Sequence, residues 1–319
     1  MKTIYFVIPP QTHPLDIIGP AQLFFECIEY GLELNLHFVS STDDVEVISS
    51  IGLGFSNLTP YQQFVLTTGD LLVVPGIEFS LLNAAGFKNE NQKFYDWLIS
   101  QYKNGATIVS VCTGAFLLAD AGLLKEKKAT THWKFFDIFE KKYPDIELLK
   151  NRLFVENERI YTSAGMLSGI DLCLYLIEKE YGTKFATGIA KEVVMYLRRG
   201  ESDPQLSIFL QYRNHLENRV HDAQDFVANN LATPFTIDDV ADNVNMSARN
   251  LTRLFKKTTG ITIGDYLSKL RVEQSVHLLG EGHTMKYVTT MCGLSSTNQL
   301  RTILKKYEDV LPADYNSIQ

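Results

Sequence analysis

Strand-like apolar segments alternate with helix-like segments along the first 200 residues, and this alternation limits the fold more than any other feature. Leu15–Tyr30 and Gln92–Lys103 have apolar residues at helical spacing. The strand-like segments between them are short, apolar and rich in β-branched residues: Thr3–Ile8, Leu34–Ser40, Val45–Ser49, Asp70–Gly76, Thr107–Cys112 and Arg159–Gly165. Buried strands that alternate with amphipathic helices predict an α/β domain, with a mostly parallel sheet covered by helices on both faces.

Length and composition predict a folded protein of two domains. The chain has 319 residues, 45% of them hydrophobic and 21% charged, and a domain averages roughly 150 residues. No apolar run approaches the roughly 20 residues of a membrane span. The opening MKTIYFVIPP favours a first strand over a secretory signal. We therefore expect a cytoplasmic protein with no membrane partner.

The second domain begins where the alternation stops. Arg198–Pro204 is charged and contains Gly and Pro, which is typical of a linker. We predict a first domain over residues 1–200, a linker over 201–217 and an all-α domain over 218–319. The chain from Gln205 onward has 12 basic and 12 acidic residues, so net charge alone does not indicate nucleic-acid binding.

Two helix-turn-helix units are expected in the second domain, over about 236–258 and 285–306. In the first, Thr236 to Asp239 fits a capping box, and Gly260 is placed to end the second helix. Ile263–Leu279 is expected to link the units. The second helices have cationic and amide side chains outward, where they fit a DNA major groove: Arg249, Asn250, Thr252, Arg253 and Lys256, and then Asn298, Gln299, Arg301, Thr302 and Lys305. The alternative is a merely solvated helix face.

These units resemble the DNA-binding domain of AraC-type transcriptional regulators. The first unit matches in Met246-Ser247, Arg249, Leu251, Arg253, Phe255-Lys256, Gly260, Tyr266-Leu267, Arg271 and Leu278-Leu279. The second matches in Cys292-Gly293, Ser295-Ser296, Lys305, Pro312 and Tyr315. It departs from the family pattern at five positions. The family usually has Phe in place of Leu294, Leu300 and Leu304, Gly in place of Asp309, and commonly Arg in place of Asn316. Leucines still fill a core. The departures therefore weaken the prediction that the second unit reads bases strongly, but they leave the prediction of its fold unchanged.

Cys112 marks a candidate site in the first domain. It lies between an expected strand and helix, and Thr113 and Gly114 allow a sharp turn there, as in a nucleophile elbow. A helix N-terminus would lower the pKa of its thiol. His132 supplies an imidazole, and Gly76 could offer a backbone N–H to an oxyanion. Asp16 lies in the loop after the first expected strand. The alternatives are that Cys112 is a small buried residue, that His132 is structural and that Asp16 is the N-cap of the first helix.

The first domain resembles the PfpI/ThiJ branch of class I glutamine amidotransferase-like domains, in the version fused to AraC-type domains in GlxA-like regulators. The resemblance lies in Asp16, Gly19-Pro20, Val74-Pro75-Gly76, Cys112 to Phe116, Ala121 to Leu124, Ala129 to Trp133 and Thr162 to Gly165. It implies a flavodoxin-like three-layer sandwich. In the enzymes of this superfamily the cysteine is the nucleophile, and by position its partners would be His132 and Asp16. In the regulators the domain senses small molecules and dimerises.

The predicted function is therefore that of a homodimeric transcriptional regulator that binds double-stranded DNA and is not an enzyme. The effector would be a small molecule, such as an amino acid or related nitrogen metabolite. The expected ligand-binding residues lie at strand ends: Asp16, Gly76, Ile77, Cys112, Thr113, His132 and Ser163. The four cysteines form no CxxC pair, so we expect no metal and no cofactor. A Cys112-dependent hydrolase, amidase or glyoxalase-like enzyme and a thiol redox sensor remain alternatives.

Overall fold

The computed structural model describes residues 1–150, 152–195, 208–213, 215–280 and 282–306. The chain divides into two compact units, Met1–Glu201 and Ser202–Gln319. Residues 201–207 and 214 of the expected linker lie outside the described residues, as do Asp309, Pro312, Tyr315 and Asn316. Among the helices that are described, none is long and apolar enough to span a bilayer.

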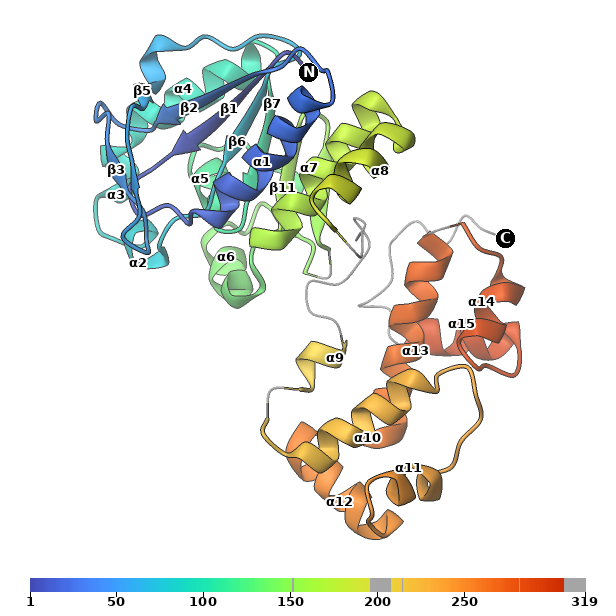
Figure 1. The fold of residues 1–319 in the computed structure, drawn as a ribbon. Helices are drawn as coiled ribbons and strands as arrows, with labels where there is room; N and C mark the ends of the chain where they lie inside the picture. The colour runs from blue at the N-terminus through green and yellow to red at the C-terminus, as the bar shows by residue number, and fades with distance from the viewer. Residues whose placement is uncertain (151, 196–207, 214, 281, 307–319) are drawn as a thin grey trace. The chain divides into compact units, whose positions relative to one another are not determined.

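A seven-stranded sheet forms the centre of the first unit (Figure 1). Its order is β10-β11-β7-β6-β1-β2-β5, and every pair is parallel except β10 with β11. The strands are β1 (Thr3–Ile8), β2 (Asn35–Ser40), β5 (Thr59–Pro60), β6 (Leu71–Val74), β7 (Thr107–Val111), β10 (Phe154–Asn157) and β11 (Ile160–Ser163). The prediction of a mostly parallel sheet is confirmed.

Helices cover both faces of this sheet, which confirms the three-layer fold. Successive side chains of a strand point to opposite faces, so Phe6 packs under one helical layer and Tyr5 and Val7 under the other. The first layer contains α1 (Leu15–Glu29), α7 (Met166–Tyr181) and α8 (Thr183–Glu192), and the second contains α4 (Gln92–Lys103), α5 (Gly114–Asp120) and α6 (Phe136–Lys142).

The expected strand Val45–Ser49 is not part of the central sheet. Only Val47–Ile48 (β3) is extended, and it pairs antiparallel with β4 (Gly54–Phe55) in a small separate sheet. Val47 is buried in the core, whereas Val45 and Ile48 are exposed, so this short hairpin adds one core residue without joining the central sheet. The segment Trp133–Lys142 begins as a 3₁₀ turn, Trp133–Phe135, before α6.

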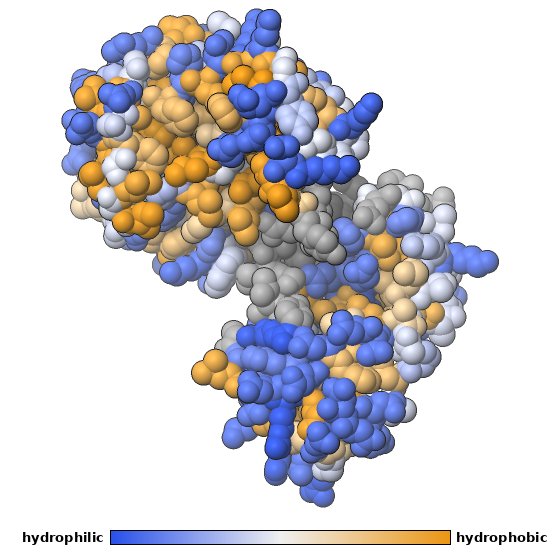
Figure 2. All heavy atoms as spheres, viewed as in Figure 1, coloured by the Kyte–Doolittle hydropathy of each residue, from blue (hydrophilic) through white to orange (hydrophobic). Residues whose placement is uncertain are grey.

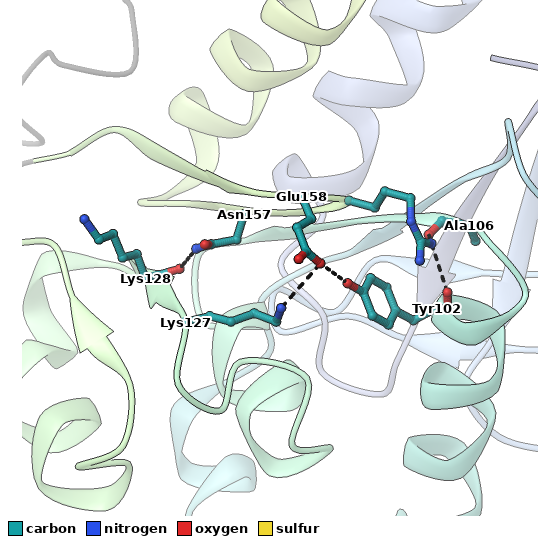
Figure 3. A network of polar contacts seen from close by, with 7 residues as sticks. Tyr102, Ala106, Lys127, Lys128, Asn157 and Glu158 are labelled. Atoms are coloured by element: carbon teal, nitrogen blue, oxygen red, sulfur yellow. Dashed lines mark hydrogen bonds and ion pairs between the residues drawn. The ribbon is translucent and has the colours of Figure 1, made fainter. Parts of the chain in front are cut away.

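A polar network fixes the β10–β11 hairpin to the rest of the sheet (Figure 3). One Arg159 guanidinium nitrogen donates to the backbone carbonyls of Tyr102 (2.9 Å) and Ala106 (2.8 Å). The Glu158 carboxylate, in the hairpin turn, accepts from the Tyr102 hydroxyl at 2.9 Å and pairs with Lys127 at 3.6 Å. These contacts tie the hairpin to the C-terminus of α4 and to the loop before the short strand β8 (Lys128–Ala129).

The described part of the second unit is helical, which confirms the all-α prediction. It contains α9 (Ile208–Gln211), α10 (Asn218–Asn229), α11 (Ile237–Asn243), α12 (Ala248–Thr259), α13 (Ile263–Gly280), α14 (Met285–Met291) and α15 (Thr297–Lys306). Helix α13 joins two separate cores, because Tyr266 packs with Phe255 in the first and Val276 packs with Val288 in the second.

The capping box and the helix-ending glycine that the sequence predicts in this unit are both present. Thr236 Oγ1 accepts from the Asp239 N–H at 3.2 Å, and the Asp239 carboxylate accepts from the Thr236 N–H at 2.6 Å, which completes the capping box before α11. Gly260 has φ +80° at the end of α12. Helix α9 lies within the stretch proposed as a linker. The Ile208 N–H there donates to Glu273 at 3.1 Å, so this part of the stretch is attached to α13.

Candidate functional site

Cys112 occupies a strained turn between β7 and α5. Its φ is +56°, which is rare for a residue other than glycine. The turn is tight enough that a Cβ on Gly114 would lie 2.4 Å from the carbonyl oxygen of Val74. The Thr131 hydroxyl donates to the Cys112 carbonyl at 2.9 Å. This geometry is that of an elbow, and it presents the thiol at the carboxyl end of the sheet.

Asp16 lies inside α1 and its side chain is fully buried. Its Oδ2 accepts from the Gly76 N–H at 2.8 Å, and its Oδ1 has no hydrogen-bond partner among the described residues. Burial raises the pKa of the Asp16 carboxyl to about 7, although the Gly76 hydrogen bond opposes this rise. The alternative that Asp16 is an N-cap is wrong, because α1 begins after Pro14 and has no side-chain cap.

Gly76 brings three strand ends together. A Cβ at this position would lie 2.8 Å from Asp16 Oδ2, 2.8 Å from Thr113 Oγ1 and 3.0 Å from Cys112 Cβ. Only glycine allows so close an approach. The Gly76 N–H is already used by Asp16, so the expectation that it is free to bind an oxyanion is wrong.

Thr113 and Ile77 join the end of β6 to the elbow. The Thr113 hydroxyl accepts from the Ile77 N–H at 3.0 Å and donates to the Ile77 carbonyl at 2.9 Å. Ser163 is also buried here, but its hydroxyl donates to the Ser110 carbonyl at 3.2 Å. Both hydroxyls therefore serve the scaffold of the site.

The Cys112 thiol does not have the lowered pKa expected beside a helix N-terminus. Its side chain is buried, and this desolvation together with the nearby Asp16 carboxylate raises its pKa. Hydrogen bonding by Thr113 acts in the opposite direction and is the smaller effect. The elbow therefore holds a protonated thiol at neutral pH, because nothing in the site outweighs the cost of burying a thiolate.

His132 lies at the same edge but is not joined to Cys112. Its Nδ1 accepts from the Lys134 N–H at 3.3 Å, and its ring lies 5.6 Å from that of Trp133 and 5.9 Å from that of Phe135. Burial and the nearby Lys134 and His13 lower its pKa. Within the described part of the chain, no hydrogen bond connects the His132 ring to the thiol. Cys112 and His132, the expected nucleophile and base, thus lie at the same edge of the sheet but do not form a hydrogen-bonded dyad.

His13 belongs to this site and was missed by the sequence reasoning. Its backbone N–H donates to the Gly76 carbonyl at 2.9 Å, and its Nδ1 lies 3.0 Å from Ser50 Oγ. Burial lowers its pKa, against the effect of Glu78. Its place three residues before Asp16, in the loop that follows β1, was the available signal. In the described residues, no cluster of three His, Cys, Asp or Glu side chains is arranged to hold a metal ion.

The DNA-facing residues of the first helix-turn-helix unit lie on the exposed side of α12. Leu251 and Phe255 are buried, while the expected contact residues are all exposed: Arg249, Asn250, Thr252, Arg253 and Lys256. The Thr252 hydroxyl donates to the Ala248 carbonyl at 2.8 Å, so its donor is occupied by the helix itself. Helix α12 has no acidic residue, and its outer face is positively charged.

Helix α15 has the same arrangement with one difference. Asn298, Gln299, Arg301, Thr302 and Lys305 are exposed, and Leu300 and Leu304 are buried where the family pattern has aromatic residues. The Gln299 side-chain carbonyl accepts from the N–H and the hydroxyl of Ser295, at 2.8 and 2.9 Å. Gln299 therefore caps the start of its own helix, and only its amide donors remain for a base.

Comparisons with known proteins match both units. Residues 2–179 match the model of the DJ-1/PfpI family, and residues 240–317 match a helix-turn-helix domain. The chain is 26% identical to the HTH-type transcriptional regulator CdhR of Pseudomonas aeruginosa over 298 residues, which are 92% of this chain and 85% of CdhR. It is 28% identical to the regulator GbdR of the same species over 219 residues, 68% of this chain but 59% of GbdR, so less than two thirds of GbdR is matched.

The chain is also similar to an enzyme and to a ThiJ/PfpI family protein of known structure. It is 31% identical to isonitrile hydratase of Pseudomonas putida over 185 residues, 57% of this chain and 74% of that enzyme. A ThiJ/PfpI family protein of Pseudomonas syringae has the same fold, with a TM-score of 0.53 at 21% identity, over 65% of this chain and 78% of that one.

Proposed function

Because the chain belongs to the DJ-1/PfpI family and also has an AraC-type helix-turn-helix domain, we propose that it is a sequence-specific transcriptional regulator of the cytoplasm, controlled by a small-molecule effector bound in the first unit. The observation that carries the proposal is the outer face of α12. Five exposed polar and cationic side chains lie on this face. The capped helix α11 and a tight turn come directly before α12, as in a helix-turn-helix unit. Figure 2 shows hydrophilic residues over the region where Figure 1 places α10 and α12.

The first unit supports a binding role for Asp16, Cys112 and their neighbours. The thiol is protonated and buried, and the Asp16 Oδ1 is a buried acceptor that no described residue satisfies. An unsatisfied buried polar atom is costly, so a ligand with a hydrogen-bond donor would be stabilised there. The effector class that the family resemblance implies is an amino acid or related nitrogen metabolite.

A homodimer through the first unit is part of this proposal. Leu15, Ile18 and Phe25 lie three and seven residues apart on α1 and are 42–46% exposed, and on the adjacent α7 Met166 and Leu167 are exposed as well. Figure 2 shows orange, apolar residues on the face that α1 and α7 cover in Figure 1. Exposed apolar surface of this kind is typical of an interface between copies.

The test is a selection of binding sites from random duplex DNA by the full-length protein. We expect a motif with two half-sites about one helical turn apart. Arg253→Ala should weaken binding to it, whereas Lys125→Ala, which removes an exposed charge from the first unit, should not. If no motif is enriched with or without a panel of amino acids and related nitrogen compounds, the regulator proposal fails.

A Cys112-dependent enzyme is the second candidate, and the similarity to isonitrile hydratase favours it. The raised pKa of the thiol and the lack of a hydrogen bond between His132 and Cys112 weigh against it. The same raised pKa weighs against a redox sensor, because oxidation requires thiolate character. Turnover of an isonitrile by the protein, abolished in Cys112→Ala, would establish the enzyme.

A further inference from the structure

A cavity of about 250 Å³ lies at the carboxyl edge of the sheet, beside the residues around Cys112. Ser41 follows β2, and Ile77 follows β6. The opposite wall is built by two four-residue helices, α2 (Phe79–Leu82) and α3 (Phe87–Glu90), with α4 and α5 behind them. Of the ligand-binding residues expected from the sequence, Ile77 lines this cavity.

The topology of the sheet makes this edge a natural ligand site. The connection from β1 to β2 contains α1 on one face, whereas the connection from β6 to β7 contains α4 on the other. Because β1 and β6 are neighbours, the chain order reverses between them. Ligands of open α/β sheets bind outside the strand ends at such a point. The cavity lies on the α4 side of it.

The volume limits the size of an occupant. Pockets for drug-sized ligands measure about 300–1,000 Å³, and this cavity, at about 250 Å³, is slightly smaller. A nucleotide cofactor or a lipid chain is too large for it. A molecule of amino-acid size fits.

The lining combines apolar walls with acceptors at one side. Ile77, Phe87, Phe94 and Leu117 are buried and form the apolar part. Ser41 is a buried residue that lines the cavity, and its hydroxyl makes no hydrogen bond to another described residue. The Asn91 amide donates to the Phe87 carbonyl at 2.8 Å, which leaves its side-chain oxygen as an acceptor.

Glu90 is the charged residue of the lining, and its side chain is exposed. Its carboxylate has no ion pair with any residue that the structure describes. The nearby Lys88 pairs with Asp120 at 3.7 Å. Glu90 is thus the charged side chain that lines the cavity. A cation is favoured here and an anion is disfavoured.

We propose that this cavity binds a small organic ammonium compound with an aliphatic body. The ammonium group donates to Glu90, with the Ser41 hydroxyl and the Asn91 side-chain oxygen as further acceptors, and the aliphatic part packs against Ile77, Phe94 and Leu117. Both backbone polar groups of Ile77 are bonded to Thr113. An occupant that shifts Ile77 therefore acts on the elbow directly, and this regulatory consequence rests on the proposed function.

The experiment compares three probes of similar shape against the full-length protein: 3-methylbutylammonium, 3-methylbutan-1-ol and 4-methylpentanoate. Binding is titrated by saturation-transfer NMR. We expect the ammonium probe to bind about tenfold more tightly than the alcohol, the scale of a hydrogen bond to a charged group, and the carboxylate not to bind. Glu90→Gln should abolish the preference for the ammonium probe, whereas Glu46→Gln, an exposed carboxylate on the same unit, should keep it.

Three results would overturn the proposal. They are no saturable binding, equal binding of the three probes, or a preference that Glu90→Gln leaves unchanged. Loss of binding in Cys112→Ala but not in Glu90→Gln would place the ligand beside Asp16 instead, and would equally overturn it. Unchanged thermal unfolding of Glu90→Gln shows that the variant is folded. None of these outcomes depends on DNA binding, so failure here and failure of the regulator proposal are distinguishable.

Discussion

The buried carboxylate of Asp16 accepts a hydrogen bond from the backbone N–H of Gly76 at 2.8 Å, and its other oxygen has no partner among the described residues. This single bond does not compensate for burial of the charge, and the pKa of Asp16 rises to about 7. Between about pH 4 and 7 the folded protein therefore retains a proton that the unfolded chain releases.

The stability of the first unit should consequently fall as pH rises from about 4 to 7 and level off above that. Over this pH interval, the free energy of unfolding of the wild type should fall by at most about 4 kcal/mol relative to that of Asp16→Asn. The limit follows from about 1.4 kcal/mol per pKa unit. The measurement is urea unfolding followed by tryptophan fluorescence, because both tryptophans, Trp97 and Trp133, lie in the first unit. His13 and His132 titrate in both proteins and cancel in the difference. If the free energies of unfolding of the wild type and Asp16→Asn changed with pH in parallel, this account of Asp16 would be contradicted.

Cys112 should react slowly with iodoacetamide at pH 7.5. Its raised pKa leaves little thiolate, and its side chain is buried. We expect a rate at least about tenfold below that of a free thiol, still rising above pH 9, as measured by mass spectrometry of the Cys112 peptide. Asp16→Asn should increase the rate, because it removes a neighbouring negative charge. A plateau of the rate below pH 7 would show that the thiol has a lowered pKa after all.

Gly76→Ala should destabilise the first unit by about 1–3 kcal/mol, the usual cost of overpacking. The new Cβ would lie within 3.0 Å of Asp16, Thr113 and Cys112. Gly54→Ala is the matched control, since its Cβ would lie 3.6 Å from Ile48, an ordinary contact. Tryptophan fluorescence in urea measures both. Equal stabilities of the two variants would mean that the three strand ends are not packed as described.

The two helix-turn-helix units should contribute differently to DNA binding. Asn250→Ala should reduce discrimination between the selected site and random DNA, because Asn reads adenine edges. Arg301→Ala should weaken binding to both DNAs alike and reduce the salt dependence by about one phosphate contact, because a cation on a phosphate carries no sequence information. Fluorescence anisotropy at several salt concentrations gives both quantities. Loss of specificity in Arg301→Ala would make the second unit a base reader.

Phe25→Lys should convert the dimer to a monomer of 36.1 kDa, measured by light scattering after gel filtration. Phe25 is 46% exposed on the apolar side of α1, and a charge there opposes burial against a second copy. Gln92→Lys, on α4 across the sheet, should leave the mass unchanged. A wild-type protein that is already monomeric would refute the proposed interface.

Most of the sheet could be predicted because buried parallel strands are continuous apolar runs. Thr3–Ile8 and Thr107–Val111 are of this kind. β10 was missed because its sequence, Phe-Val-Glu-Asn, is half polar, as an antiparallel edge strand allows. The expected strand at Val45–Ser49 was mostly wrong, because alternation also occurs in a short hairpin outside the central sheet.

The sequence by itself determined which residues come to the carboxyl edge of the sheet, since Asp16, Gly76 and Cys112 each follow a strand. It also determined the outward face of α12, because helical spacing alone separates Leu251 and Phe255 from Arg249 and Arg253. Only the tertiary structure decided the state of the Cys112 thiol, because its pKa depends on burial and on the distance to Asp16. The same holds for His132, whose ring bonds to its own chain, and for the cavity beside Glu90, whose walls come from strands and helices far apart in sequence.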